Sequence, residues 1–289
     1  MQVRDTVEKA AVEIMRRAVT ELPRDVKNAL RKAYEEEDTP TSKTQLKAIL
    51  ENAELGGKLK APICQDTGVI LFYATIGNKF GDPSFLPEAL RDAVKKATVE
   101  IPLRPNAVHP FTRNNTGDNT GVNMPYVNWE ITLGDYLDLT VLPKGGGSEN
   151  MSAFAMLKPG DGIPGVMKFV LETVANAGAQ PCPPTIIGVG VGGSADIALK
   201  LAKKALLRPI DKPHPDTDIA KAETELLSAV NKLRIGPMGL GGRFTSLGVN
   251  IEYAHCHTAS LPVGVNVQCW CHRKATARIH KDGKVEHIA

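Results

Sequence analysis

The chain has 289 residues, a hydrophobic content of 42% and a formal net charge of +3 at pH 7. This length and apolar content suffice for a sizeable core. No apolar run reaches the roughly 18 residues of a membrane span, and Met1–Asp5 lacks a signal-peptide core. Basic and acidic residues are mixed and aromatic residues make up only 5%, so no nucleic-acid-binding surface is predicted. Five scattered cysteines form no disulfide framework, which favours a cytoplasmic protein with metal-binding or catalytic thiols.

The first part of the chain has the apolar spacing of helices. Pro23 is expected to end the first helix, and Ser42 with Gln45 forms a capping-box pattern for the third, which Gly56 and Gly57 are expected to stop. Helices are predicted over residues 7–22, 26–33, 42–55, 88–98 and 165–177.

Strand and turn signals dominate from Lys60 onward. Gly134-Asp135 separates two apolar runs, 129–133 and 136–141, and Asp282-Gly283 separates 275–280 from 284–288. Both patterns are typical of two-residue β-hairpins, which pair antiparallel strands. We therefore expect a mixed α/β (α+β) fold with a helical N-terminal part and antiparallel hairpins. We expect one domain over residues 1–289, helical over about 1–57 and α/β over about 58–289. The proline-rich stretch 208–218 is expected to join elements within it.

Three cysteines lie beside loop chemistry. Cys64 opens the polar turn Cys64–Gly68 ahead of a buried strand, Cys182 is flanked by prolines, and Cys269 precedes Trp270. Thiolates suit iron–sulfur clusters, and three ligands on a four-iron cluster leave one iron open for a substrate oxygen. No CxxC pair strengthens this interpretation, and buried thiols that act as small apolar side chains are the alternative. Cys256 and Cys271 leave the ligand set ambiguous at this point.

Two glycine-rich segments are candidate anion sites. Gly145–Gly147 follows an expected strand, so its backbone N–H groups could form an anion-binding nest or a flexible turn. Gly188–Gly193 fits the dinucleotide pattern GxGxxG. The flanking hairpins instead favour a strand-to-helix turn with close backbone packing.

The candidate polar partners of these loops are Arg104, His109, Arg113 and His257, together with Asp66. Arg104 precedes Pro105 in an extended segment and could bind a carboxylate through two hydrogen bonds. Asp66 lies two residues after Cys64 and is either an acid–base group or a turn cap. His257, in His255-Cys256-His257, could be catalytic, part of a zinc site or structural.

In their order along the chain, four motifs together resemble the α subunits of two-subunit class I (iron–sulfur) fumarate hydratases, which are closely related to L-tartrate dehydratase α subunits. These motifs are Ile63–Gly68, Lys144–Ser148, Cys182-Pro-Pro with the glycine run, and Leu261–Gly264 followed by Cys269. The resemblance covers nearly the whole chain.

The resemblance implies a specific set of site residues. Cys64, Cys182 and Cys269, rather than Cys271, would hold a [4Fe–4S] cluster. Gln65, Arg104 and the backbone of Gly147 would position the substrate, and Asp66 and His257 would lie beside the leaving hydroxyl or the substrate carboxylates.

The implied reaction is the reversible hydration of fumarate, a small dicarboxylate, to (S)-malate. Dehydration of L-tartrate is the nearest alternative. The residue that removes the carbon-bound proton is expected on a β subunit, so the protein is expected to be a hetero-oligomer. Two further hypotheses remain: an iron–sulfur sensor with Cys256 or Cys271 as fourth ligand, and a nucleotide-binding oxidoreductase that uses Gly188–Gly193.

Overall fold

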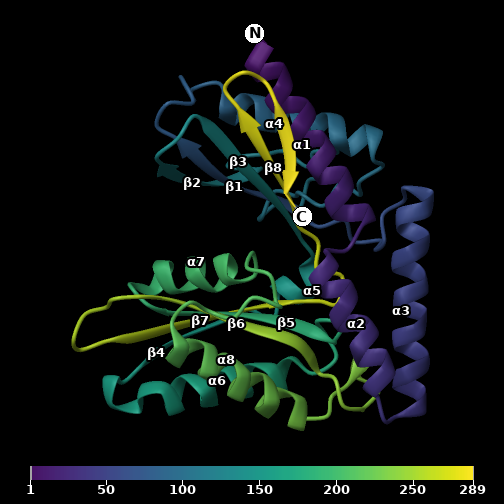
Figure 1. Cartoon of the computed structure of the whole chain (residues 1–289), viewed down its shortest axis with the longest axis vertical. Coiled ribbons are helices and arrows are strands. Elements are labelled where there is room, and N and C mark those ends of the chain that lie inside the picture. Colours follow the sequence, from purple (N-terminus) through teal and green to yellow (C-terminus); the bar gives the residue numbers. More distant parts are fainter. Residues whose placement is uncertain (1, 289) are drawn as a thin grey trace. The chain divides into compact units, whose positions relative to one another are not determined.

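The computed structural model describes residues 2–288, and the chain divides into two compact units (Figure 1). Unit 1 contains Met1–Pro23, Asn52–Gly146 and Arg273–Ala289, and unit 2 contains Arg24–Glu51 and Gly147–His272. Each unit holds one β-sheet with helices against it, so the predicted mixed α/β fold is confirmed. The N-terminal helices are shared between the units, since α1 belongs to unit 1 and α2 to unit 2.

Unit 1 is built on a five-stranded sheet with the order β2-β1-β3-β8-β9. Its strands are β1 (Val69–Gly77), β2 (Tyr126–Thr132), β3 (Tyr136–Lys144), β8 (Ala275–His280) and β9 (Val285–Ile288). Helices α1 (Gln2–Thr20) and α4 (Leu86–Glu100) cover one face of this sheet. Ile14, Phe72, Leu90 and Leu139 are completely buried between these layers.

One of the two predicted hairpins is wrong. Strand β1 lies between β2 and β3, parallel to the first and antiparallel to the second. The turn at Gly134 therefore passes around the end of β1, where the Gly134 carbonyl accepts the Lys79 N–H at 2.8 Å. Turn chemistry reports where the chain reverses but not which strand pairs with which. The hairpin at Asp282-Gly283 is confirmed by the antiparallel pairing of β8 with β9.

Helix α3 (Pro40–Leu59) differs from its prediction at both ends. It begins before Ser42, whose hydroxyl donates to the Gly241 carbonyl at 2.5 Å instead of capping the helix. It also continues through Gly56 and Gly57. A Cβ atom at Gly56 would collide with the side chain of Ile63, so this glycine allows close packing and does not end the helix. The other predicted helices of this region are confirmed as α1, α2 (Arg24–Glu36) and α4.

Unit 2 is built on a four-stranded sheet with the order β4-β7-β5-β6. Its further elements are β4 (Ala153–Leu157), β5 (Thr185–Gly192), β6 (Ser246–Ala254), β7 (Leu261–Gln268), α5 (Gly146–Glu149), α6 (Gly162–Ala177), α7 (Ala195–Ala205) and α8 (Thr217–Lys232). Helices α6 and α8 share an apolar core with β5, β6 and β7 on one face of the sheet. Helix α7 covers the other face.

The glycine run belongs to strand β5 rather than to a phosphate-binding loop. A Cβ atom at Gly188 would collide with the carbonyl oxygen of Ala202, and one at Gly190 would lie 2.5 Å from the Ala202 amide nitrogen. Both glycines therefore let α7 approach the sheet closely, which supports the packing interpretation.

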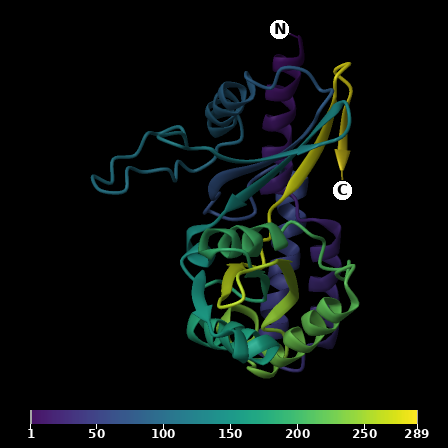
Figure 2. The same cartoon turned by 90° about the vertical axis from the view of Figure 1, so that its left-hand side faces the viewer.

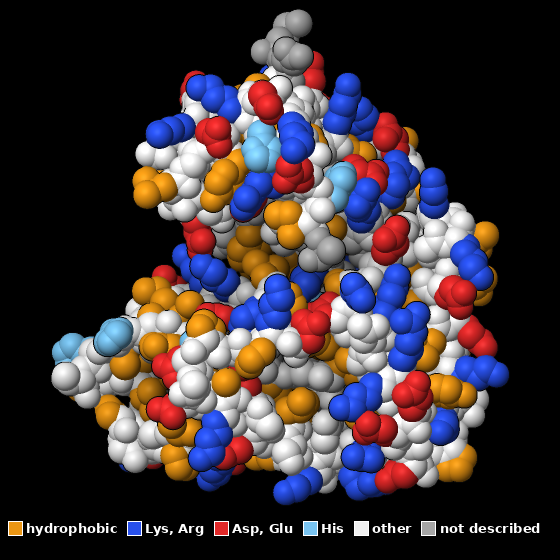
Figure 3. Space-filling model, viewed as in Figure 1, with side chains coloured by type: hydrophobic (Ala, Val, Ile, Leu, Met, Phe, Trp, Pro, Cys, Tyr) orange, Lys and Arg blue, Asp and Glu red, His pale blue; other side chains and the backbone are white. Residues whose placement is uncertain are grey.

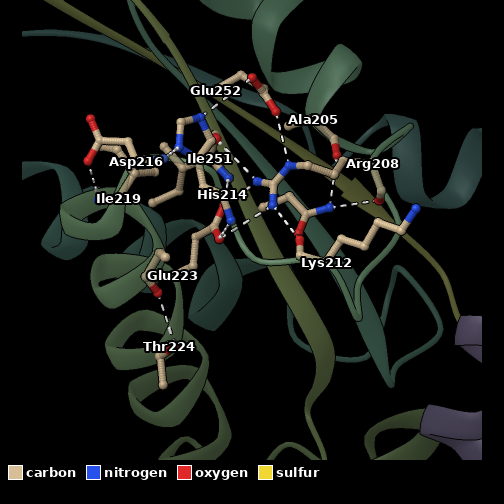
Figure 4. Close-up of polar contacts among 12 residues, drawn as sticks. Ala205, Arg208, Lys212, His214, Asp216, Ile219, Glu223, Thr224, Ile251 and Glu252 are labelled. Carbon is tan, nitrogen blue, oxygen red and sulfur yellow. Dashed lines mark hydrogen bonds and ion pairs between the residues drawn. The ribbon is translucent and has the colours of Figure 1, made fainter.

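A buried ion-pair network ties α8 to the sheet of unit 2 (Figure 4). The Arg208 guanidinium donates to the carboxylates of Glu223 and Glu252 and to the carbonyl oxygens of Lys212 and Ile251. Glu223 in turn accepts the backbone N–H of Ile251 at 2.7 Å. Each of the three guanidinium nitrogens of Arg208 donates to at least one acceptor, as a buried charge requires.

The surface carries mixed charge. Basic and acidic side chains are interspersed over the face shown in Figure 3, in keeping with the small net charge. No helix within residues 2–288 is long and apolar enough to cross a membrane.

Candidate active site

The carboxylate of Asp66 is fixed by three N–H donors in unit 1. Its Oδ1 accepts from the Gly68 amide at 2.9 Å and from the Asn106 side chain at 3.0 Å, and its Oδ2 accepts from the Gly146 amide at 2.8 Å. A carboxylate offers about four acceptor positions. One acceptor position of the Asp66 carboxylate therefore remains, and the orientation of this carboxylate is already set.

The backbone beneath Asp66 is held by a buried cation. Arg273 is 1% exposed and its guanidinium donates to the Asp66 carbonyl oxygen. A Cβ atom at Gly145 would lie 3.2 Å from both the Arg273 Nη2 and the Asp66 Oδ2, so a glycine leaves room for both groups. One of the glycine N–H groups predicted to bind an anion, that of Gly146, binds this internal carboxylate.

The predicted substrate-positioning residues of unit 1 lie next to this carboxylate in the chain. The Arg104 carbonyl accepts the hydroxyl of Thr67 at 3.2 Å, and the Arg104 guanidinium is exposed without a hydrogen bond or ion pair within residues 2–288. Gln65 is exposed, and its Oε1 lies 3.7 Å from the thiol of Cys64. Cys64 itself is half-buried.

A long loop between α4 and β2 is pinned close to Arg104. The side-chain amide of Asn119, 2% exposed, donates to the Arg104 carbonyl at 3.2 Å and to the Thr98 hydroxyl at 3.1 Å, and its oxygen accepts the Asn106 N–H at 2.7 Å. Figure 2 shows the loop extending away from the sheet of unit 1. The same anchor therefore fixes Arg104 and the asparagine that binds Asp66.

Cys182 and Cys269 lie at one end of the unit 2 sheet. Cys182 precedes β5 and Cys269 follows β7, and these strands are antiparallel. The Trp270 N–H donates to the Cys182 carbonyl at 3.2 Å. Both cysteines are half-buried, and Cys182 has a left-handed backbone with φ +54°. Gly147 belongs to the same unit, where a Cβ atom would lie 3.4 Å from the Gln180 carbonyl.

His257 lies at the other end of that sheet. It occupies the loop between β6 and β7, and β6 runs parallel to β5, so the loop follows the strand end opposite to Cys182. Strand β7 spans eight residues, which at about 3.3 Å per residue separates its ends by roughly 23 Å. The fold of unit 2 therefore does not bring His257 to Cys182 and Cys269.

The remaining cysteines have different environments. Cys271 is 1% exposed within the protein interior, and Cys256 is exposed. None of the five cysteines, all of which lie within residues 2–288, forms a disulfide. Within residues 2–288 no group of three or more His, Cys, Asp or Glu side chains is arranged to hold a metal ion.

The chemistry near Cys269 nevertheless suits a bound group. Gln268 is 0% exposed, and neither polar atom of its side chain has a hydrogen-bond partner within residues 2–288. Such a buried amide is costly unless another group satisfies it. A buried, unsatisfied amide on the residue before a half-buried thiol is compatible with a thiolate-ligated cluster at this strand end.

Sequence reasoning did not identify Asn106 and Arg273. Asn106 lies only two residues after Arg104, within a stretch already considered, but its role depends on the turn at Asp66. Arg273 follows the cysteine-rich segment, and a buried arginine has no local sequence signal.

Comparison with known proteins places these residues in context. The model of the fumarate hydratase (Fumerase) family matches residues 8–278. A Methanocaldococcus jannaschii protein named "Putative L(+)-tartrate dehydratase subunit alpha" is 52% identical over 289 residues, covering 99% of this chain and all of that protein. The L(+)-tartrate dehydratase subunit alpha of Escherichia coli K12 is 37% identical over 271 residues, covering 93% of this chain and 89% of that protein.

Proposed function

Because the chain belongs to the fumarate hydratase (Fumerase) family, we propose that this hydro-lyase α subunit uses a [4Fe–4S] cluster to interconvert fumarate and (S)-malate. The observation that carries the proposal is the Asp66 carboxylate, held by three N–H donors two residues from Cys64. A fixed carboxyl group beside a thiolate ligand is suited to exchanging a proton with a hydroxyl group that leaves or adds.

Cys64, Cys182 and Cys269 would hold the cluster through their thiolates. When bound, the cluster supplies a Lewis acid that makes hydroxide a better leaving group. Cys271 is not among the proposed ligands, and its side chain is 1% exposed within the core. A cytoplasmic setting suits this chemistry, because thiols stay reduced there.

The chain's own residues bind and orient the substrate. The unpaired guanidinium of Arg104 binds one substrate carboxylate through two hydrogen bonds. Gln65 and the backbone of Gly147 hold the hydroxyl-bearing end. Asp66 gives its proton to the departing hydroxyl in dehydration and takes one from water in hydration, and Asn106 keeps the carboxyl in line.

A β subunit completes the reaction. The relatives are named as alpha subunits, which implies a partner chain. This partner carries the base that removes the carbon-bound proton, and the assembly is a hetero-oligomer. Negative charge on that carbon spreads into the neighbouring carboxylate, where Arg104 stabilises it.

L-Tartrate is the second candidate substrate, because both relatives named above are called tartrate dehydratase subunits. Side-by-side turnover of malate and L-tartrate by the complex of this chain with the β-type subunit of its own organism separates the two. Faster turnover of malate supports a fumarate hydratase. Faster turnover of L-tartrate would replace the fumarate hydratase assignment with L-tartrate dehydratase.

Iron and acid-labile sulfide, measured after anaerobic reconstitution, test the cofactor. We expect about four of each per chain. Cys64→Ser, Cys182→Ser and Cys269→Ser should each lose the cluster, and Cys271→Ser should keep it. A Cys271→Ser protein that alone loses iron would overturn the ligand assignment.

A further inference from the structure

We infer that the side chain of Gln268 donates a hydrogen bond to a sulfur atom of the group that Cys182 and Cys269 bind. This bond helps to retain the group and raises its redox potential, so Gln268 is a positioning residue of the site. The inference rests on the proposed function, in which the bound group is a [4Fe–4S] cluster. It follows from the environment of one buried amide in unit 2.

Gln268 ends strand β7 on the sheet face that α5 and α7 cover. Alternate residues of a strand point to the same face, so Gln268 shares its face with Gly264 and Asn266. A Cβ atom at Gly264 would lie 2.7 Å from the Ala198 carbonyl of α7, and the Asn266 amide donates to Glu149 of α5 at 3.1 Å. The intervening valines belong to the apolar core on the opposite face. The amide of Gln268 therefore points away from that core.

This amide is buried without a protein partner. The Gln268 side chain is 0% exposed, and neither Nε2 nor Oε1 forms a hydrogen bond within residues 2–288. Asn250 of β6, a buried amide in the same sheet, has the usual arrangement, because its Nδ2 donates to the carbonyl oxygens of Ala205 and Arg208 at 3.0 and 2.9 Å. A buried amide with no partner costs free energy. Gln268 is therefore suited to a partner that the chain itself does not provide.

The two cysteines at this strand end mark where such a partner binds. Cys269 follows Gln268 directly, and the Trp270 N–H donates to the Cys182 carbonyl at 3.2 Å, so the two cysteine segments are joined. Both thiols are half-buried, and neither forms a disulfide. Thiolates and cluster sulfides carry negative charge and accept hydrogen bonds, and the Nε2 of a glutamine offers two N–H donors. The amide therefore lies beside an acceptor of the kind that it lacks.

A hydrogen bond from Nε2 to sulfur has two consequences for the bound group. It holds the group more firmly, and it stabilises the more negative, reduced state, which raises the redox potential. When the group is absent, the same amide is a burden on the fold. Replacing Gln268 by methionine, a flexible side chain that has no donor, should therefore have opposite effects in the empty and the loaded protein.

Urea unfolding of the full chain without iron and sulfide measures the effect on the empty protein. Gln268→Met should unfold at the same urea concentration as wild type or at a higher one, because it removes an unpartnered buried amide. Asn250→Leu is the contrasting control and should unfold at a lower concentration, because it leaves two carbonyl oxygens without their donor. A Gln268→Met chain that is less stable than wild type, or insoluble, would overturn the inference, because its amide would already have a partner such as an internal water.

Iron release from the complex with the β-type subunit of the same organism measures the effect on the loaded protein. With a chelator under anaerobic conditions, Gln268→Met should lose iron at least about tenfold faster than wild type, as is usual when a group that supports a metal site is removed. Its midpoint potential, measured by electron paramagnetic resonance during a redox titration, should be more negative. Gln180→Met is the matched control, because this glutamine is exposed and lies two residues before Cys182. It should match wild type in both measurements.

The outcomes separate this inference from the proposed function. A Gln268→Met complex with the iron release and midpoint potential of wild type would overturn the inference and leave the proposed function intact. A more negative potential together with faster iron release would support it, because a purely structural role of Gln268 would lower the stability of the empty chain and leave the potential unchanged. A wild-type complex that takes up no iron and sulfide would overturn the proposed function, and this inference with it.

Discussion

Replacing Glu223 by alanine should destabilise unit 2 by about 4 kcal/mol. The Glu223 carboxylate is 6% exposed and accepts the Arg208 guanidinium, the Ile251 N–H at 2.7 Å and the His214 N–H at 3.3 Å. Alanine leaves the buried Ile251 amide without an acceptor, which costs about 1–3 kcal/mol. It also leaves the Arg208 charge, whose side chain is 15% exposed, with Glu252 as its only carboxylate partner within residues 2–288.

Thermal and urea unfolding measure this loss. At about 2–4 °C per kcal/mol for a unit of this size, the midpoint should fall by roughly 8–16 °C. A Trp129→Phe background leaves Trp270, which belongs to unit 2, as the only fluorescent tryptophan. Glu225→Ala is the matched control, because this exposed glutamate lies on the same helix and, within the described part of the chain, forms an ion pair only with Lys221, at 3.9 Å. Its loss should cost less than about 0.5 kcal/mol.

A double-mutant cycle checks the reasoning itself. If the charge pair is the main cause, Arg208→Met combined with Glu223→Ala should cost at least about 2 kcal/mol less than the sum of the single changes. Additive costs, or equal midpoints for the Glu223 and Glu225 variants, would refute the assignment of the stability to this network.

Three further predictions address packing, the site and pH. Gly190→Ala should unfold the protein or abolish its soluble yield, because the new Cβ would collide with the Ala198 carbonyl in α7. Asn106→Ala should lower turnover about tenfold while costing no more than about 2 kcal/mol in urea unfolding, because it frees Asp66 without opening the core. A hydrogen-bonded arginine lowers the pKa of Asp38 to about 2. The Asp38 carboxylate therefore contributes to stability above pH 4, and this contribution fades toward pH 2. The stability difference between wild type and Asp38→Asn, measured by urea unfolding at each pH, should shrink over that range.

Each of these three predictions has a control or a result that would contradict it. Gly160→Ala places its Cβ in open space and should be tolerated, so equal damage from both glycine variants would point to a general loss of flexibility. Asn114→Ala, on the exposed loop, should keep wild-type turnover. A constant separation between wild type and Asp38→Asn from pH 5 to pH 2 would exclude the titration of that carboxyl as the cause.

The predictable part of the fold is the part that local chemistry decides. The hairpin at Asp282-Gly283 followed from its turn residues, and the apolar stripes located α1, α2, α4 and α6. The same turn rule failed at Gly134-Asp135, because a strand from earlier in the chain inserts between the two arms. Gly56 was misread because a close contact with Ile63, not a helix end, requires a glycine there.

The site was predictable as a set of residues but not as an arrangement. The motif around Asp66 was evident, but its bond to Gly146 joins positions 80 residues apart. Arg273 reaches the same turn from 207 residues away. The distance of His257 from Cys269 follows from strand directions, which no single motif encodes.

The anchoring of the loop between α4 and β2 affects how the protein responds to proteolysis. Residues 109–117 are all exposed, and the buried Asn119 lies after them while Arg104 and Asn106 lie before them. A cut at the tip therefore leaves both new ends tied by the hydrogen bonds of one asparagine. Limited digestion should give two fragments that stay together in native gel filtration and separate only in denaturant. The loop is thus a natural place for an affinity tag or an inserted domain.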